Sequence, residues 1–178
     1  MKLPAALVAL ALATPAAAAE ARIDGVSVAV EGRRAQVSFA LIDGFDHGLR
    51  ERIQSGLPTG VVYEIELFKD RKRWWDRSLE SAELQVVAMY NAVTREYLVN
   101  FKLDGRLIES RQVHDLAALE TAMTRVEGLS AFSLEKAPRD RRLLVRVRAE
   151  LGSSTVLAFI PTLLVTDWAE SPKFRPLP

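Results

Sequence analysis

Apolar and polar residues alternate one by one over several separate stretches, and this period of two constrains the fold more than any other feature of the sequence. Val37, Phe39 and Leu41 alternate with polar or small neighbours, and the same pattern recurs in residues 22–30, 61–67, 84–90, 97–103 and 141–151. Successive side chains of a β-strand point to opposite faces of its sheet, so each stretch predicts a strand with one buried face. A second face exposed to water is typical of antiparallel sheets.

Turn residues separate these stretches and indicate which of them are neighbours. Gly32 lies in a predicted turn between the first two stretches, and residues 91–94 are predicted to turn between two others. Tyr90 and Tyr97 would then be near neighbours across a hairpin. Asp104-Gly105 is a strong turn signal, after which residues 107–108 start a short returning strand.

Two segments change to a spacing near four residues, which predicts two helices. The first covers residues 46–54, with Asp46 as its N-cap and Gly56 after its last turn. The second covers residues 115–127, with Asp115 as its N-cap and Gly128 after its end. The apolar stripe of this second helix consists of Leu116, Leu119, Met123 and Val126.

Together these elements predict a mainly β fold. We expect an antiparallel β-sandwich or a strongly curled sheet of about seven or eight strands with two short helices. A short strand is predicted at residues 132–134. The tail, residues 161–178, is predicted to be irregular, with Trp168 as its anchor.

The N-terminus has the features of a secretory signal. Lys2 precedes a short apolar run over residues 3–12, and small residues at 16–19 follow. The run is shorter than the roughly 20 residues of a membrane-spanning helix. We therefore expect residues 1–19 to be a cleaved signal peptide and residues 20–178 to form a single extracytoplasmic, β-rich domain in the periplasm, with no transmembrane segment after cleavage.

Composition excludes several classes of function. The chain has 24 Lys and Arg against 23 Asp and Glu, which gives no electrostatic case for binding nucleic acid. It has no cysteine, which excludes disulfides, thiol catalysis and cysteine-containing zinc sites.

One segment combines indole rings with a run of positive charges. Guanidinium groups stack on indole faces, and both residue types are frequent at the energetic centres of interfaces. The alternative is that one tryptophan packs in the core and the other covers it. The candidate partner-binding surface consists of Arg71, Arg73, Trp74, Trp75 and Arg77.

No catalytic or metal-binding constellation is apparent. His47 and His114 each neighbour an aspartate at a predicted helix start, but adjacent residues rarely point at one common atom. No serine lies in the Gly-x-Ser-x-Gly pattern of an exposed nucleophile. We expect no cofactor, no metal site and no enzymatic activity.

Several segments taken together resemble a known family. They are Ser55-Gly56-Leu57-Pro58, Arg73-Trp74-Trp75-Asp76, residues 90–97 (Tyr-Asn-Ala-Val-Thr-Arg-Glu-Tyr), and Asp167-Trp168 with Ser171. This set is similar to the exported proteobacterial domain of unknown function 4390 family, whose members are often labelled proline-rich signal peptide proteins. The resemblance implies export and a single periplasmic domain, and it brings no activity, cofactor or catalytic residue. Family members are often encoded near membrane sensor kinases, which implies an envelope signalling partner.

Three functional hypotheses remain open. The first is a non-enzymatic binding or adaptor module of the cell envelope with an envelope or membrane protein as partner. The second is a carrier of a small apolar ligand, whose cavity mouth would be lined by residues 156–164. The third and least favoured is an envelope hydrolase.

Overall fold

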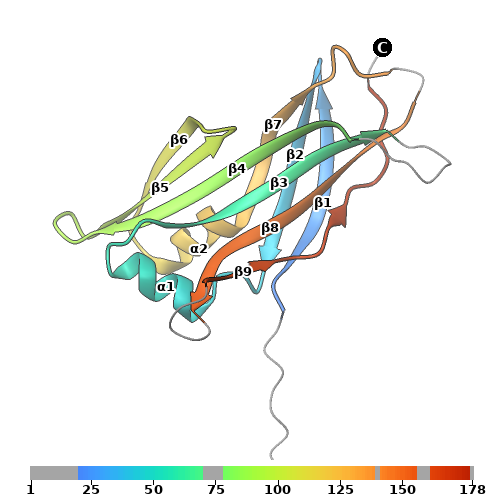
Figure 1. The fold of residues 1–178 in the computed structure, drawn as a ribbon. Helices are drawn as coiled ribbons and strands as arrows, with labels where there is room; N and C mark the ends of the chain where they lie inside the picture. The colour runs from blue at the N-terminus through green and yellow to red at the C-terminus, as the bar shows by residue number, and fades with distance from the viewer. Residues whose placement is uncertain (1–19, 70–77, 139–140, 156–160, 177–178) are drawn as a thin grey trace, which may run out of the picture.

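The computed structural model describes residues 20–69, 78–138, 141–155 and 161–176, which form two antiparallel β-sheets and two helices (Figure 1). The smaller sheet has the order β1–β2–β7, with β1 at Arg22–Glu31, β2 at Arg34–Ile42 and β7 at Arg125–Ser133. The mainly β fold with antiparallel sheets predicted from the alternating pattern is therefore confirmed.

The larger sheet has seven strands in the order β10–β8–β3–β4–β5–β6, with β9 paired to β8. Their bounds are β3 Thr59–Lys69, β4 Ser78–Asn91, β5 Glu96–Leu103, β6 Arg106–Val113, β8 Leu143–Thr155, β9 Pro161–Val165 and β10 Ala169–Glu170. The helices are α1, His47–Gln54, and α2, Leu116–Thr124.

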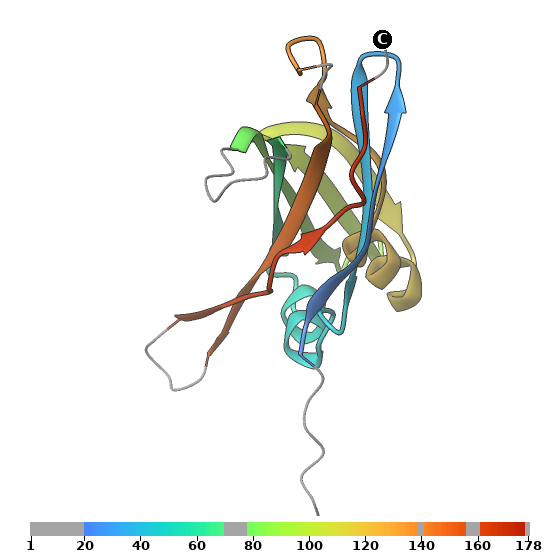
Figure 2. The same ribbon diagram turned by 90° about the vertical axis from the view of Figure 1, so that its right-hand side faces the viewer.

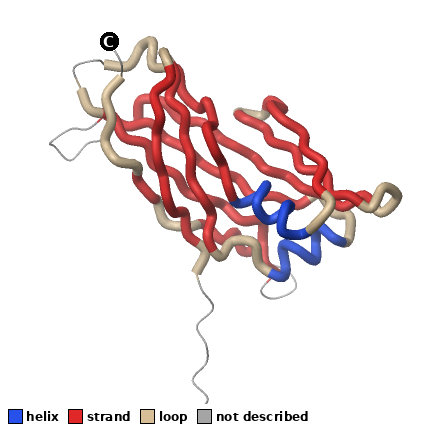
Figure 3. The backbone as a smooth tube through the Cα atoms, turned by 180° about the vertical axis from the view of Figure 1, so that it is seen from behind, coloured by secondary structure: helices blue, strands red, loops and turns tan. Residues whose placement is uncertain are grey.

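The two sheets lie face to face, as the view turned by 90° shows (Figure 2). Both helices lie at one end of this arrangement, where α1 contacts β3 and β4, and α2 contacts β5 and β7 (Figure 3). None of the helices in the described part of the chain has the length and apolarity that crossing a membrane requires.

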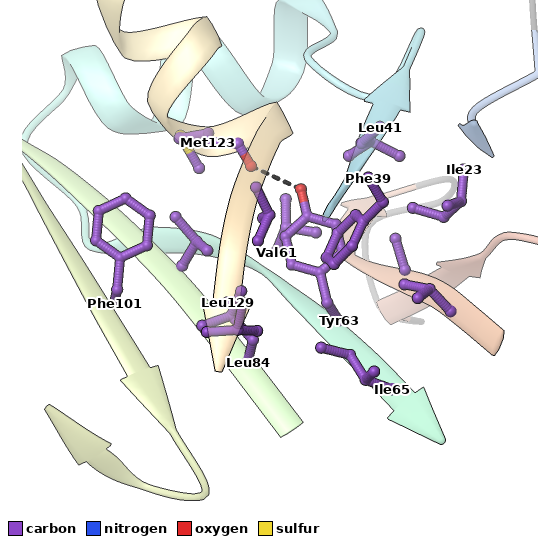
Figure 4. Packing of buried hydrophobic residues seen from close by; sticks show 14 of the residues in the cluster. Ile23, Phe39, Leu41, Val61, Tyr63, Ile65, Leu84, Phe101, Met123 and Leu129 are labelled. Carbon is purple, nitrogen blue, oxygen red and sulfur yellow. Dashed lines mark hydrogen bonds between the residues drawn. The ribbon is translucent and has the colours of Figure 1, made fainter. Parts of the chain in front are cut away.

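The inner faces of the two sheets form the hydrophobic core. Tyr63 of β3 lies at its centre, fully buried, with its ring centroid 5.0 Å from that of Phe39 on β2 (Figure 4). Its hydroxyl donates a hydrogen bond of 2.6 Å to the backbone carbonyl of Met123 in α2. Apolar side chains from both sheets and both helices surround this contact: Ile23, Leu41, Leu49, Ile53, Val61, Ile65, Leu84, Val99, Leu119, Leu129 and Val147.

The predicted hairpin turns are confirmed. The Arg95 N–H donates to the Asn91 carbonyl over 2.8 Å, which closes the turn between β4 and β5. Tyr90 lies directly opposite Tyr97, and their ring centroids are 4.9 Å apart. Asp104 and Gly105 have φ values of 50° and 77°, the positive values that a tight two-residue hairpin turn requires.

The first helix agrees with its prediction, whereas the second ends earlier than predicted. Helix α2 stops at Thr124, and Arg125 already has extended backbone with φ −114°. Val126 is buried on β7, opposite Phe39, and Gly128 lies inside that strand with φ 61°. Pairing with β2 therefore overrides the helical spacing that placed Val126 on a helix and Gly128 at a helix end.

The irregular tail was also predicted wrongly. Strands β9 and β10 both pair with β8, and Phe174 forms an isolated bridge to Leu143. These additional strands explain why the described part of the chain has more strands than predicted. The short returning strand predicted at residues 107–108 is the eight-residue strand β6.

Candidate functional site

The predicted binding surface remains a prediction, because its segment lies outside the described residues. The surface consists of Arg71, Arg73, Trp74, Trp75 and Arg77. The chain enters this segment after Lys69 at the end of β3 and leaves it at Ser78, which pairs with Phe68. Lys69 itself lies opposite Leu143 at the start of β8. Lys69 and Ser78, the described residues on either side of the segment, lie at one end of β3 and β4.

On the outer face of β8, Trp168 packs against two arginines. Ala169 lies opposite Val147, which is fully buried between the sheets. Since neighbours in a strand alternate, Arg146 and Arg148 point to the outer face. Their guanidinium carbons lie 4.3 and 4.6 Å from the centroid of the Trp168 ring, within the range of cation–π interactions. Arg146 also lies 4.2 Å from the ring centroid of Phe68 on β3.

Each arginine is paired with a glutamate directly across the strand pair. The register places Glu64 opposite Arg148 and Glu66 opposite Arg146. Arg148 donates two hydrogen bonds of 2.9 Å to the two carboxylate oxygens of Glu64, and Arg146 Nε donates one of 2.7 Å to Glu66. We call Glu64, Glu66, Arg146, Arg148 and Trp168 the Trp168 cluster. The two ion pairs balance the arginine charges, and together with the Trp168 ring they hold both guanidinium groups in place.

A further carboxylate borders the Trp168 cluster at Glu150. Glu150 Oε1 lies 4.0 Å from Arg148 Nη2. A side-chain hydrogen bond with Glu64 raises the pKa of Glu150, and desolvation and the negative charge of Glu64 raise it further, while Arg148 lowers it. Such a bond between two carboxyl groups requires one proton. A proton on Glu150 therefore lessens the repulsion between these two carboxyl groups.

A groove of ≈ 270 Å³ runs beside the cluster on the outer face of β3 and β4. Glu64 and Glu66 form one side, and Glu83 and Asp104 belong to its other side. Asp104 Oδ1 accepts a hydrogen bond of 2.9 Å from the backbone N–H of Glu83, which fixes the hairpin turn. The groove is lined mainly by carboxylates, so the outer face offers acidic groups next to an aromatic ring.

Both histidines lie on the surface with glutamates as their nearest charged partners. His47 Nδ1 is 3.5 Å from Glu51 Oε2, and His114 Nδ1 is 3.4 Å from Glu96 Oε1. The neighbouring aspartates instead cap the helices: Asp46 and Asp115 accept 2.7 Å hydrogen bonds from the N–H groups of Leu49 and Ala118. Within the described ranges, no three His, Asp or Glu side chains gather as metal ligands would.

Sequence reasoning did not identify the Trp168 cluster as a unit. Trp168 was predicted as an anchor of the tail, whereas Arg146, Arg148, Glu64 and Glu66 are the polar members of the alternating stretches 141–151 and 61–67, for which only one buried face was predicted. Two arginines alternating on one strand match two glutamates alternating on another. This match would have indicated the cluster if β3 and β8 had been known to pair.

Comparison with known proteins finds one family and no individual relative. The family model described as Domain of unknown function (DUF4390) matches residues 18–175. No curated protein and no solved structure matches the chain. Since the match spans nearly the whole chain, including every described strand and helix, the chain belongs to the DUF4390 family, a family of domains of unknown function.

Proposed function

We propose that this protein is an exported, non-enzymatic binding module of the cell envelope that holds a protein partner on the outer face of its large sheet. The observation that carries the proposal is the stacking of both Arg146 and Arg148 on the Trp168 ring on that face. Tryptophan and arginine are the residue types most enriched at the energetic centres of protein interfaces. Ion pairs with Glu66 and Glu64 across β3 and β8 hold Arg146 and Arg148 in place before a partner arrives, which lowers the entropy lost on binding.

The charges around Trp168 indicate the chemistry of this partner. Glu64 and Glu66 already neutralise the two arginines, whereas Glu83 and Asp104 add carboxylates in the adjacent groove. A surface of this kind favours a partner segment with an apolar or aromatic residue beside lysine or arginine, because complementary charges select the partner and speed its approach. Because we expect the protein in the periplasm, the proposed partner is an envelope or membrane protein, for example a sensor kinase.

The described residues do not favour a carrier of a small apolar ligand. Such a carrier would need a cavity between the sheets, but large side chains such as Tyr63, Ile65 and Leu84 fill that space in the described part of the chain. The groove on the outer face is lined by charged groups instead.

Site-specific crosslinking tests the proposed surface without disturbing the core. A photoreactive amino acid replaces Asp167 or Glu170, which are exposed on either side of Trp168, and in the control it replaces Val93 on the turn between β4 and β5. We expect adducts with one envelope protein from positions 167 and 170, and loss of these adducts when Trp168→Ala is added. Trp168→Phe should retain part of the signal. The same adduct from position 93, or adducts unaffected by Trp168→Ala in a folded variant, would contradict the proposal.

Export is tested separately on the native protein. Fractionation should recover the protein with the periplasm, and mass spectrometry should show an N-terminus at Glu20. A full-length chain starting at Met1 in the cytoplasmic fraction would contradict the location but leave the crosslinking test of the surface unaffected.

A further inference from the structure

Strand β6 is an edge of the large sheet. It pairs with β5 and has no second partner among the described strands. Seven of its eight residues are exposed, including the apolar side chains of Leu107 and Ile108. Both edge strands carry a register shift, β6 next to Ile108 and β1 at Gly25. From Glu109 to Val113, however, β6 pairs regularly with β5, and a regular edge with unpaired N–H and carbonyl groups is a template for another strand.

The charges on β6 are arranged so that the strand is complementary to itself. Glu109 lies opposite Phe101 of β5 and Arg111 lies opposite Val99, so both point to the same face of the sheet. Ser110 between them points to the other face, where its hydroxyl donates a 2.6 Å hydrogen bond to Asn100 Oδ1. In an antiparallel pair of two β6 strands centred on Ser110, each Glu109 faces the Arg111 of the other copy. Opposite charges directly across a strand pair stabilise that register.

We propose that two copies of this chain associate through antiparallel pairing of their β6 strands, centred on Ser110. The pairing satisfies backbone groups along both edges and forms two symmetric ion pairs from Glu109 and Arg111. In the single chain these two side chains already contact each other over 2.7 Å, and Arg111 stacks on Phe101 at 5.2 Å. Both are therefore held close to the positions that the second copy requires.

Charge reversal on β6 tests this register directly. In Glu109→Arg, arginine faces arginine at both symmetric positions, and in Arg111→Glu, glutamate faces glutamate. Each single variant should raise the dissociation constant of the dimer by about tenfold or more, since like charges across a strand pair repel. The double variant Glu109→Arg with Arg111→Glu should dimerise like the original protein. An equimolar mixture of the two single variants should form heterodimers, because all cross-strand contacts are then of opposite charge.

Dimerisation is measured by sedimentation velocity of the purified protein up to about 1 mM. In the mixture, one variant carries a tag, and co-elution of the untagged variant with it identifies heterodimers. Glu51→Arg on α1 is the matched control, since it reverses an exposed charge away from β6 and should leave dimerisation unchanged. Circular dichroism confirms that each variant is folded. A protein that stays monomeric at all these concentrations would overturn the proposal. A dimer that persists in both single variants, or a mixture that does not associate, would overturn it as well.

Discussion

The hydroxyl of Tyr63 connects the large sheet to the end of α2, and its removal provides a quantitative test of the core. It donates a 2.6 Å hydrogen bond to the carbonyl of Met123, one residue before the last residue of the helix. The final carbonyls of a helix have no partner within the helix. Tyr63→Phe keeps the ring and its contact with Phe39 but leaves this buried carbonyl without the hydroxyl donor.

The cost of an unsatisfied buried acceptor is about 1–3 kcal/mol. For a chain of this size, each kcal/mol lowers the melting temperature by about 2–4 °C. We therefore expect Tyr63→Phe to lower the free energy of unfolding in urea by this amount without changing the m-value. The control is Tyr90→Phe, on a half-buried ring of the same sheet, with a smaller expected loss. A loss below about 0.5 kcal/mol in Tyr63→Phe would refute the assigned role of the hydroxyl.

The same side chain predicts a dependence on alkaline pH. Burial raises the pKa of Tyr63 far above its ordinary value of 10.0. Above that ordinary value the unfolded chain loses the phenolic proton while the folded protein keeps it. The contribution of Tyr63 to stability is therefore complete below about pH 10 and falls as the pH rises further. The stability difference between the original protein and Tyr63→Phe should shrink from about pH 9 to about pH 11, and a constant difference would contradict this cause.

Two further substitutions test the surface and the strand packing. Glu150→Gln should stabilise the protein at neutral pH, because a carboxyl with a raised pKa contributes stability when protonated and loses it as the pH rises through that pKa. The gain in the free energy of unfolding in urea, relative to the original protein, should vanish in acid. An equal gain at neutral pH and in acid would contradict the contact with Glu64. Gly60→Ala should cost about 1–3 kcal/mol in the same assay, since its Cβ would collide with the backbone of Val86 and Val87. Gly48→Ala on α1, where the added Cβ meets ordinary contacts, should instead be neutral or stabilising by up to about 1 kcal/mol, and similar effects at both positions would refute the packing argument.

Local sequence patterns predicted the elements that are defined by neighbouring residues. The hairpin between β4 and β5 follows from alternation on both sides of Asn91, and the helix α1 follows from Asp46 and Gly56 at its ends. Val126 shows where such patterns fail. It continues the four-residue spacing of α2 and equally fits a strand, and contact with Phe39 on β2 decides between the two. That contact joins residues far apart in the sequence, so no local signal could reveal it.

The Trp168 cluster depends on the same kind of long-range pairing. Glu64 and Arg148 are 84 residues apart and meet because β3 pairs with β8. Alternating charges on each strand predict a wet face but not which strand lies opposite. Sequence reasoning therefore selected residues 71–77, where aromatic and basic residues are adjacent in the chain.

The hydrophobic core and the proposed binding surface lie on opposite faces of the large sheet, and this separation makes the proposed surface testable. The inner side chains of β3 and β8 are almost completely buried, and burial of apolar side chains is the dominant favourable contribution to folding. The pair of Glu64 and Arg148 on the outer face is about 30% exposed, and ion pairs near the surface contribute at most about 1 kcal/mol. Substitutions in the Trp168 cluster should thus leave the fold intact. A loss of crosslinking in such a variant would report on the partner contact itself and not on unfolding.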